Sequence, residues 1–341
     1  MFTDHFQPGW RDCYTAWLTH VFQRSGSDAT VANYASIIRR FFEACGKSPE
    51  MVTRSDVELF ASKPLVQRDR GRAPAAHTRN GRIMAISSFY SYAGGYEYMD
   101  GKGALVTLTD RNPAKGIRQS RTQARYRSMT MDEFQRFIAA IPQDGDKRHA
   151  RDRAIFLTLW WTCRRREEVA SLLWGNIRKN AFVDPKTQQS REGWTYTTRI
   201  KGGEVVSAEL PSPAMDAILE SLRISGRIET MEPDSPLFLA YPAHEWPPVA
   251  ADRWHHISGL SIWRRMRVYL HTAGLDETAF SVHCLRHAGA LARYLYADSG
   301  PLEIMKLLNH HDLKVTTIYL RELNMSHDLA ALRLQEKYGA F

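Results

Sequence analysis

Hydrophobic positions recur at helical spacing through the first hundred residues. Between residues 29 and 45 they form a stripe with a period close to that of an α-helix, which predicts an amphipathic helix. Similar patterns predict helices over residues 10–24, 54–61 and 75–93, with Ser55 as N-cap of the 54–61 helix and Gly94-Gly95 ending the last. We therefore expect a small helical bundle. The stripe in residues 29–45 consists of Val31, Tyr34, Ile37, Ile38, Phe41 and Phe42.

The period changes in the second half of the chain. Helical spacing is kept over residues 131–141 (with Thr130 as N-cap), 151–162 and 167–173. Residues 194–200 and 204–210 then alternate, and Lys201-Gly202-Gly203 between them predicts a β-hairpin. Ser212-Pro213 starts another helix, with Ser as N-cap and Pro at the first position, and helices dominate from there. The predicted fold is mainly α: an N-terminal helical bundle and a mixed α+β domain with a small antiparallel sheet.

A basic stretch separates these two regions. Residues 111–127 contain six basic residues and no acidic one, and Asn112-Pro113 opens the stretch. Polar residues break any apolar period there, so we expect an extended linker between a helical domain at residues 1–110 and a second domain at residues 128–341. A solvated linker explains this charge as well as a strap across a phosphate backbone does. After Arg111, its basic residues are Lys115, Arg118, Arg121, Arg125 and Arg127.

Composition narrows the class of protein only slightly. A formal charge of +9 and a pI near 9.4 suit a polyanionic partner, although many basic proteins bind no nucleic acid. No uncharged apolar run reaches the ~18 residues of a membrane span, and the N-terminus lacks the pattern of a secretion signal. The four cysteines are scattered without a CxxC pair, which argues against a zinc module and for a reducing, cytoplasmic compartment.

The helix predicted over residues 75–93 carries its own polar group. Arg79 and Arg82 lie three residues apart on one face, with Asn80 nearby. This face suits contact with DNA or simply with solvent.

The second domain contains residues that suit phosphate chemistry. In a helix starting at His283, a step of ~100° per residue puts His283, Arg286 and His287 on one face, in the first turn where the helix dipole favours an anion. An apolar stripe lies roughly opposite and predicts the core contact; its members are Ala288, Leu291, Ala292 and Leu295. Taken alone, an HxxR pattern is more often a surface histidine and a capping arginine.

Arg164-Arg165-Arg166 precedes Glu167-Glu168 and follows an apolar helix with two tryptophans. A surface ion-pair cluster would explain this, but three adjacent arginines behind such a helix can hardly all face solvent. We expect at least one to point inward and to be held by Glu168, three residues beyond Arg165. Arginine suits a planar, bidentate clamp on phosphate oxygens.

Together these residues provide the groups that cleavage of a phosphodiester by a side-chain nucleophile requires. Two arginines and Lys201 neutralise a phosphodiester in a five-coordinate state, histidines bind an oxygen or move a proton, and a tyrosine hydroxyl attacks. Guanidinium groups then supply the positive charge that a metal supplies elsewhere. No convincing carboxylate cluster for a metal is present, so we expect neither metal nor cofactor.

The order of these motifs resembles that of the tyrosine recombinase (phage integrase) family over nearly the whole chain. Residues 162–169 (TCRRREEV) resemble T-G-x-R-x-x-E-L, and residues 283–287 (HCLRH) match H-x-L-R-H. Lys201-Gly202-Gly203 resembles the hairpin lysine motif, and residues 308–310 (LNH) followed by TTIY at 316–319 resemble L-G-H with its tyrosine nine residues later. Residues 30–34 and 83–90 and Asn112-Pro113 resemble the helical core-binding (SAM-like) domain and its exit.

The resemblance implies specific roles. Tyr319 would attack the scissile phosphate of duplex DNA, leaving a 3′-phosphotyrosyl link. Arg165, Arg286 and His310 would bind its oxygens, with Lys201 as general acid and His283 as base; Glu168 and His287 would support them. It also implies a DNA-bound homotetramer with a tail helix at residues 326–334 docking on a neighbour. Because the chain begins almost at the first core-binding helix, it looks like a simple two-domain Cre or Xer type rather than a lambda type.

Two positions depart from the family pattern. Cys163 and Asn309 stand where the motifs have glycine, a residue that often marks a positive φ or a close backbone approach. Neither change removes a chemical group. The alternatives are a type IB topoisomerase or hairpin telomere resolvase, a DNA-binding protein impaired in catalysis, for which Cys163 is the only support, and a general basic RNA-binding protein.

Overall fold

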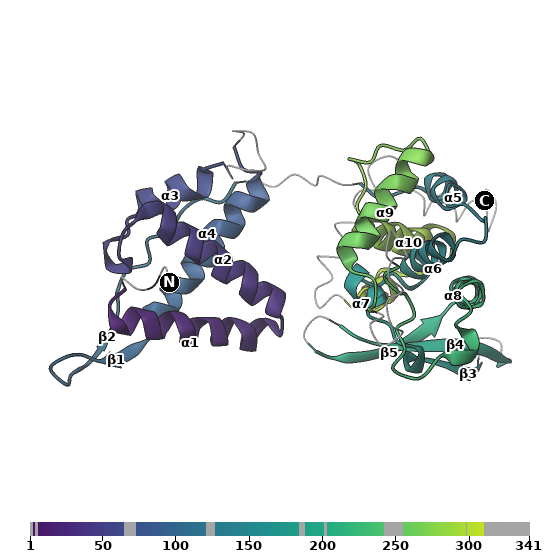
Figure 1. Cartoon of the computed structure of the whole chain (residues 1–341), viewed down its shortest axis with the longest axis horizontal. Coiled ribbons are helices and arrows are strands. Elements are labelled where there is room, and N and C mark those ends of the chain that lie inside the picture. Colours follow the sequence, from purple (N-terminus) through teal and green to yellow (C-terminus); the bar gives the residue numbers. More distant parts are fainter. Residues whose placement is uncertain are drawn as a thin grey trace, which may run out of the picture. The chain divides into compact units, whose positions relative to one another are not determined.

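The computed structural model describes residue 3 and residues 6–64, 73–120, 127–183, 188–200, 203–241, 255–297 and 299–309. The chain divides into an N-terminal unit (residues 1–124 with 201–203) and a C-terminal unit (residues 125–200 and 204–341), and the division between residues 124 and 125 falls inside the predicted linker. The described residues are mostly helical, with two small antiparallel sheets (Figure 1). This confirms the predicted fold class.

The described part of the N-terminal unit contains four α-helices: α1 (Pro8–Ser25), α2 (Asp28–Cys45), α3 (Arg54–Ser62) and α4 (Ala76–Ala93) (Figure 1). Their shared core is strongly aromatic, and Phe89 makes edge-on contacts with Trp17 (ring centroids 5.3 Å apart) and Phe42 (6.1 Å). The N-cap of α3 is Thr53 rather than Ser55, because Thr53 and Asp56 form a reciprocal capping box.

Two features of the N-terminal unit were not expected. A short hairpin follows α4, in which β1 (Glu97–Met99) pairs antiparallel with β2 (Leu105–Thr107). The start of the predicted linker is also not extended, because Lys115 N–H donates to the Asn112 carbonyl in a turn. Ala114 and Ile117 are buried in the core of the bundle. Residues 111–120 are therefore part of the folded N-terminal unit.

The described helices of the C-terminal unit pack around α6, whose second half is apolar (Figure 1). Its helices are α5 (Met131–Ala139), α6 (Lys147–Thr162), α7 (Arg166–Ala170), α8 (Ser212–Ile224), α9 (Gly259–Thr272), α10 (Val282–Tyr296) and α11 (Pro301–Leu307). Thr130 caps α5 as predicted, whereas α8 starts one residue early, with Pro211 at the N-cap and Ser212 already helical. Single turns of 3-10 helix lie at Pro49–Met51, Trp174–Asn176 and Ile228–Thr230.

One three-stranded antiparallel sheet flanks these helices, in the order β3 (Ile177–Val183), β4 (Ser190–Arg199), β5 (Val205–Leu210). The β4–β5 hairpin was predicted, and β3 was not. In the register, Arg199 faces Val205; Lys201 and Gly202, which were predicted between these strands, lie outside the described residues. The helix α8 packs against both α6 and β4 (Figure 1).

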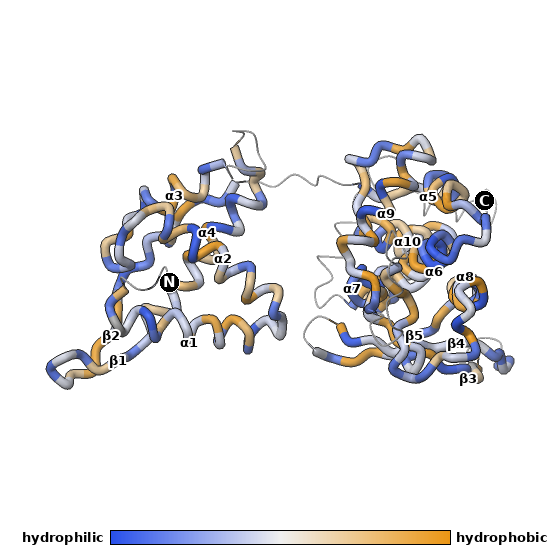
Figure 2. The backbone as a smooth tube through the Cα atoms, viewed as in Figure 1, coloured by the Kyte–Doolittle hydropathy of each residue, from blue (hydrophilic) through white to orange (hydrophobic). Residues whose placement is uncertain are grey.

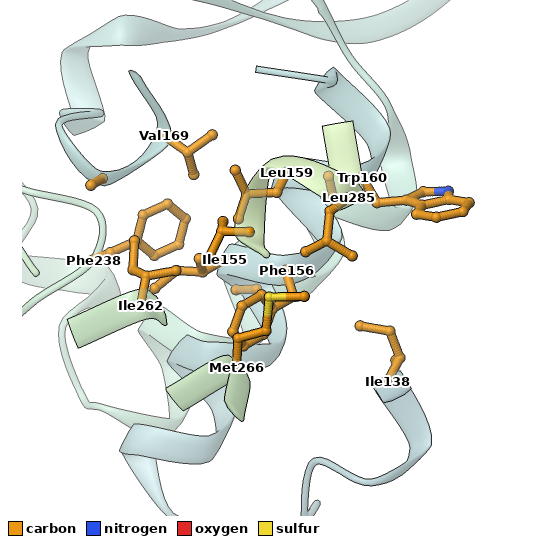
Figure 3. Packing of buried hydrophobic residues seen from close by; sticks show 14 of the residues in the cluster. Ile138, Ile155, Phe156, Leu159, Trp160, Val169, Phe238, Ile262, Met266 and Leu285 are labelled. Atoms are coloured by element: carbon orange, nitrogen blue, oxygen red, sulfur yellow. The ribbon is translucent and has the colours of Figure 1, made fainter. Parts of the chain in front are cut away.

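Apolar residues of α6 occupy the middle of this unit. Ile155, Phe156 and Leu159 meet side chains from other helices and loops, including Phe238, Met266 and Leu285 (Figure 3). Hydrophilic and hydrophobic residues mix along most elements of both units (Figure 2), as expected of helices with one buried face. No helix among the described residues is long and apolar enough to span a membrane.

Candidate active site

The three arginines between α6 and α7 have three different environments. Arg165 is the N-cap of α7; its backbone N–H donates to Glu168 Oε2 (3.0 Å) and its Nη1 to Glu168 Oε1 (2.9 Å). Glu168 is 6% exposed, whereas the Arg165 side chain keeps 34% of its surface accessible. Arg166 pairs with Glu167 at the surface. The expected pairing of Glu168 with Arg165 is present, and it orients a guanidinium that remains open to a ligand.

Arg286 reaches the same junction from α10. It is 1% exposed; its Nη1 donates to the Cys163 carbonyl (2.7 Å) and its Nη2 to the Leu308 carbonyl. Burial, followed by the positive charge of Arg165, lowers the pKa of Arg286 to about 10, so it stays protonated at neutral pH. Two like charges therefore lie close together with the Glu168 carboxylate nearby. A bound anion would relieve their repulsion.

The histidines of α10 lie beside this arginine. His283 is exposed in the first turn of the helix, and its ring meets that of the half-buried His287 edge-on, with centroids 4.3 Å apart. The predicted face is thus only partly at the surface, because the carbonyl contacts of Arg286 draw it inward. On the opposite side, Ala288 is buried in the core while Leu291 is only half-buried.

Both replacements of the family's glycines adopt left-handed backbone. Cys163 has φ 51° and Asn309 has φ 46°. Cys163 ends α6 and turns its carbonyl to Arg286. Burial raises the pKa of the Cys163 thiol, and Arg293 Nη1 lies 3.2 Å from its Sγ. The unusual residues therefore keep the backbone path that glycine would take.

A close helix contact fixes the depth of α10. A Cβ on Gly289 would lie 2.2 Å from the Trp160 carbonyl oxygen and 3.0 Å from Cys163 Sγ. Only glycine allows α10 to approach the end of α6 this closely. The sequence signal for this contact is an isolated glycine inside a helical pattern, three residues after Arg286; the motifs themselves do not point to it.

Three predicted catalytic residues, Lys201, His310 and Tyr319, lie outside the described residues. The structure describes the residues that precede Lys201 and His310 in the sequence: β4 ends at Arg199, and α11 is followed by Leu308 and Asn309. Arg121 and Arg125 and the predicted tail helix at residues 326–334 are also outside this set. Among the described residues, no group of three His, Cys, Asp or Glu side chains is placed to hold a metal ion.

The basic residues predicted to bind DNA separate into two kinds. Lys115 and Arg118 are exposed. Arg82 is 5% exposed and donates to the carbonyls of Phe60, Ala61 and Lys63 at the end of α3. This corrects the expectation that Arg82 shares an open face with Arg79, because Arg82 caps a helix end instead.

Both ends of the described linker are tied to a folded unit. Asn80 exchanges two hydrogen bonds with the Ser120 backbone (2.8 and 2.9 Å), and Arg79 donates to the Arg118 carbonyl. Arg127 forms a bidentate pair with Glu133 in the C-terminal unit, which lowers the pKa of Glu133 to about 2. Arg79, Asn80 and Arg127 thus hold the linker, a role the sequence did not indicate.

A groove of about 640 Å³ lies on the N-terminal unit next to this anchored segment. Basic and hydroxyl side chains line it, among them His20, Arg24, Ser88, Tyr92 and Lys115. Phosphate oxygens accept hydrogen bonds from all of these groups. The groove is the strongest candidate for a nucleic-acid interface within the described part of this unit.

The comparisons with known proteins identify the family. The model of the phage integrase family matches residues 127–325, more than half of the chain. The chain belongs to the phage integrase family. The tyrosine recombinase XerC of Caldanaerobacter subterraneus is 25% identical over 263 residues, 77% of this chain and 63% of that protein. A tyrosine recombinase of Thermosipho africanus is 22% identical over 312 residues, 91% of this chain and 93% of that protein.

Solved structures of a site-specific recombinase and of an integrase share the fold. XerH site-specific recombinase, bound to a palindromic difH substrate after cleavage, aligns over 96% of this chain and 88% of its own, with a TM-score of 0.63 and 16% identity. A lambda integrase tetramer on a Holliday junction aligns over 93% of this chain and 79% of its own, with a TM-score of 0.60 and 15% identity. The match to the phage integrase family model confirms the predicted family, and these structures confirm the fold. Because both Xer and lambda proteins match, the fold does not separate these two subtypes.

Proposed function

We propose that this integrase-family protein is a site-specific recombinase that cuts and rejoins duplex DNA through a 3′-phosphotyrosyl link at Tyr319. The observation that carries the proposal is the pair Arg165 and Arg286. They come from separate elements; burial and then the charge of Arg165 lower the pKa of Arg286, and the Glu168 carboxylate paired with Arg165 partly offsets the two positive charges. Such a pair suits a phosphoryl group whose negative charge grows in the transition state.

The proposed reaction conserves bond energy. The hydroxyl oxygen of Tyr319 attacks phosphorus and gives its proton to His283, the P–O5′ bond breaks, and Lys201 protonates the leaving 5′ oxygen. Arg165, Arg286 and His310 bind the nonbridging oxygens during the step. Attack by a 5′-hydroxyl from a partner duplex then reverses it. This needs no nucleotide hydrolysis, because the phosphotyrosyl bond retains the energy of the phosphodiester.

DNA binding is assigned to the groove and to the basic stretch next to it. The groove beside α4 and the exposed Lys115 and Arg118 contact phosphates from the N-terminal unit, and Arg121 and Arg125 continue this basic stretch. Arg82 is left out because it is buried. We also propose that four copies assemble on two sites in the cytoplasm, with the tail helix at residues 326–334 docking between copies.

Covalent trapping tests the proposal. The full-length protein is incubated with a pool of randomised, nicked duplexes that prevent religation, and adducts are separated on denaturing gels. We expect an adduct with wild type and with Tyr296→Phe, an exposed tyrosine on α10 that serves as matched control, and none with Tyr319→Phe. An adduct that persists in Tyr319→Phe, or no adduct from wild type on any duplex, contradicts the mechanism.

A second assay separates recombination from the topoisomerase alternative. The captured sequence is placed in one supercoiled plasmid and omitted from another. A recombinase exchanges strands only between copies of the captured site. Steady relaxation of the plasmid without that site would instead favour a type IB topoisomerase.

A further inference from the structure

Arg164 is the buried member of the arginine triplet, and the reaction proposed above gives it no role. It is 4% exposed, and its Nε donates to the Tyr196 hydroxyl on β4 (2.6 Å). With the Asn309 amide nitrogen facing the Lys306 carbonyl (2.8 Å), Asn309 Oδ1 accepts from Arg164 Nη1 (3.2 Å). Both partners are neutral, and no carboxylate in the described part of the chain pairs with Arg164.

A buried arginine without a carboxylate partner is costly. Removing a guanidinium from water carries a large desolvation penalty unless its donors are satisfied. A methionine in the same space would pack against Tyr196 without that penalty. Core packing alone therefore does not account for an arginine at position 164. Its two side-chain hydrogen bonds indicate a more specific role.

The positions of its partners along the chain give that explanation. Tyr196 precedes Lys201 by five residues on the strand that enters the β4–β5 hairpin. Asn309 is followed directly by His310, and Arg164 itself is followed directly by Arg165. One guanidinium therefore bonds to two other segments, and each of the three segments leads into a proposed catalytic residue.

Arg286 makes a parallel connection. It donates to the carbonyls of Cys163 and Leu308, the residues just before Arg164 and Asn309. The end of α6 and the end of α11 are thus joined twice, once through main-chain carbonyls and once through side chains. The proposed function gives Arg286 a phosphate contact as well, whereas the side-chain hydrogen bonds of Arg164 within the described part of the chain are the connecting ones.

We propose that Arg164 is a positioning residue that ties β4 and the end of α11 to the Arg165 turn, and so holds in place the segments that lead along the chain into Lys201 and His310. The proposal rests on the proposed function. Arginine suits this role because its planar guanidinium donates to both Tyr196 and Asn309. A lysine ammonium on a flexible side chain does not reproduce that geometry. Displacing a catalytic group by about 1 Å costs on the order of 100-fold in rate.

The test compares Arg164→Met with Arg223→Met, a matched loss of an exposed arginine that pairs with Glu220 on α8. Single-turnover cleavage of pre-bound DNA should fall about 10- to 100-fold in Arg164→Met and not in Arg223→Met, while the DNA dissociation constant is unchanged in both. Arg164→Lys should restore only part of the rate. Equal losses of binding and cleavage, or wild-type cleavage by Arg164→Met, would overturn the proposal.

Single-partner variants keep the test valid if Arg164→Met does not fold. Tyr196→Phe and Asn309→Gly each remove one acceptor, and glycine accepts the positive φ of position 309. Each should slow cleavage without weakening DNA binding. Adding Asn309→Gly to Arg164→Met should cause no further loss, since both remove the same contact; additive losses would contradict the tie.

Hydrogen exchange on DNA-free protein tests the connection independently of activity. In Arg164→Met, amide exchange should speed up in the peptide that ends at Asn309 and stay unchanged in α8. Unchanged exchange at Asn309 refutes the connection. If exchange responds as expected but wild type forms no covalent adduct, the recombinase function fails and the catalytic role of Arg164 falls with it, whereas the structural tie stands.

Discussion

The two units differ in where they bury charge. Among the described residues, the N-terminal unit buries a single charged side chain, Arg82. The C-terminal unit buries five, all on or beside α6, α7 and α10: Arg151, Asp152, Arg164, Glu168 and Arg286. The N-terminal core is instead built from interlocking aromatic rings such as Trp17 and Phe89.

This difference indicates that the core of the N-terminal unit mainly maintains its fold, whereas the buried charges of the C-terminal unit also position polar groups. Ring packing is sufficient to hold four helices in a fixed arrangement, and the one buried arginine of that unit satisfies carbonyls at a helix end. The C-terminal unit accepts the desolvation cost of several charges. Their contacts hold the backbone around Arg165 in advance of substrate, which is what electrostatic preorganisation for a phosphoryl group requires.

The largest expected effect comes from breaking a buried ion pair in the C-terminal unit. Asp152 accepts from Arg151 Nη2 and Arg265 Nε, both at 2.6 Å, and is 1% exposed. Asp152→Ala leaves both arginines uncompensated and should lower the free energy of unfolding of this unit by about 3–5 kcal/mol. Urea denaturation measures the change.

The control for that variant is Glu220→Ala, which breaks an exposed pair and should cost less than about 1 kcal/mol. If the two variants are equally stable, the buried charges do not distinguish the C-terminal unit as described.

A smaller effect is expected from the one buried arginine of the N-terminal unit. Arg82→Met removes the donor to three carbonyls and should cost about 1–3 kcal/mol. Because Arg82 is buried, we expect the dependence of DNA affinity on salt to keep its slope in Arg82→Met, whereas Arg118→Gln should flatten it. Fluorescence anisotropy across a salt series measures both. A flatter slope in Arg82→Met would place this arginine at the DNA after all.

The smallest effect concerns the left-handed residue at the end of α6. Cys163→Gly relieves the strain of φ 51° but loses a buried thiol, so stability should change by no more than about 1 kcal/mol. Cys163→Ala keeps the strain and loses the same sulfur, so it should be the less stable of the two. Thermal unfolding compares them. A more stable alanine variant would show that the backbone at this position is not strained.

Local signals predicted a large part of the fold. Helices with one buried face and a capping residue were found where the pattern placed them, as for α5 with Thr130, because periodicity and caps act within a few residues. The pairing of Arg165 with Glu168 was predictable for the same reason. The strand β3 was missed because apolar and polar residues do not alternate in its sequence, Ile-Arg-Lys-Asn-Ala-Phe-Val. It forms a strand through its pairing with β4.

The remaining features depend on contacts between distant residues. Arg164 is buried because Tyr196 and Asn309 are brought to it from 32 and 145 positions away, and no local pattern reports that. Arg82 was expected on an open face because helical spacing fixes which residues are neighbours but not which side is covered. The end of α3 covers it.

The contact at Gly289 limits how far the position of α10, and of Arg286 on it, can change. Where α10 crosses the end of α6, the clearance is smaller than one methyl group, and Arg286 lies less than one turn away on the same rigid helix. A Cβ added at Gly289 would push α10 away from the end of α6 and would move the Arg286 guanidinium with it. A change that alters no charge and removes no hydrogen-bonding group would thus be transmitted to the phosphate as a displacement.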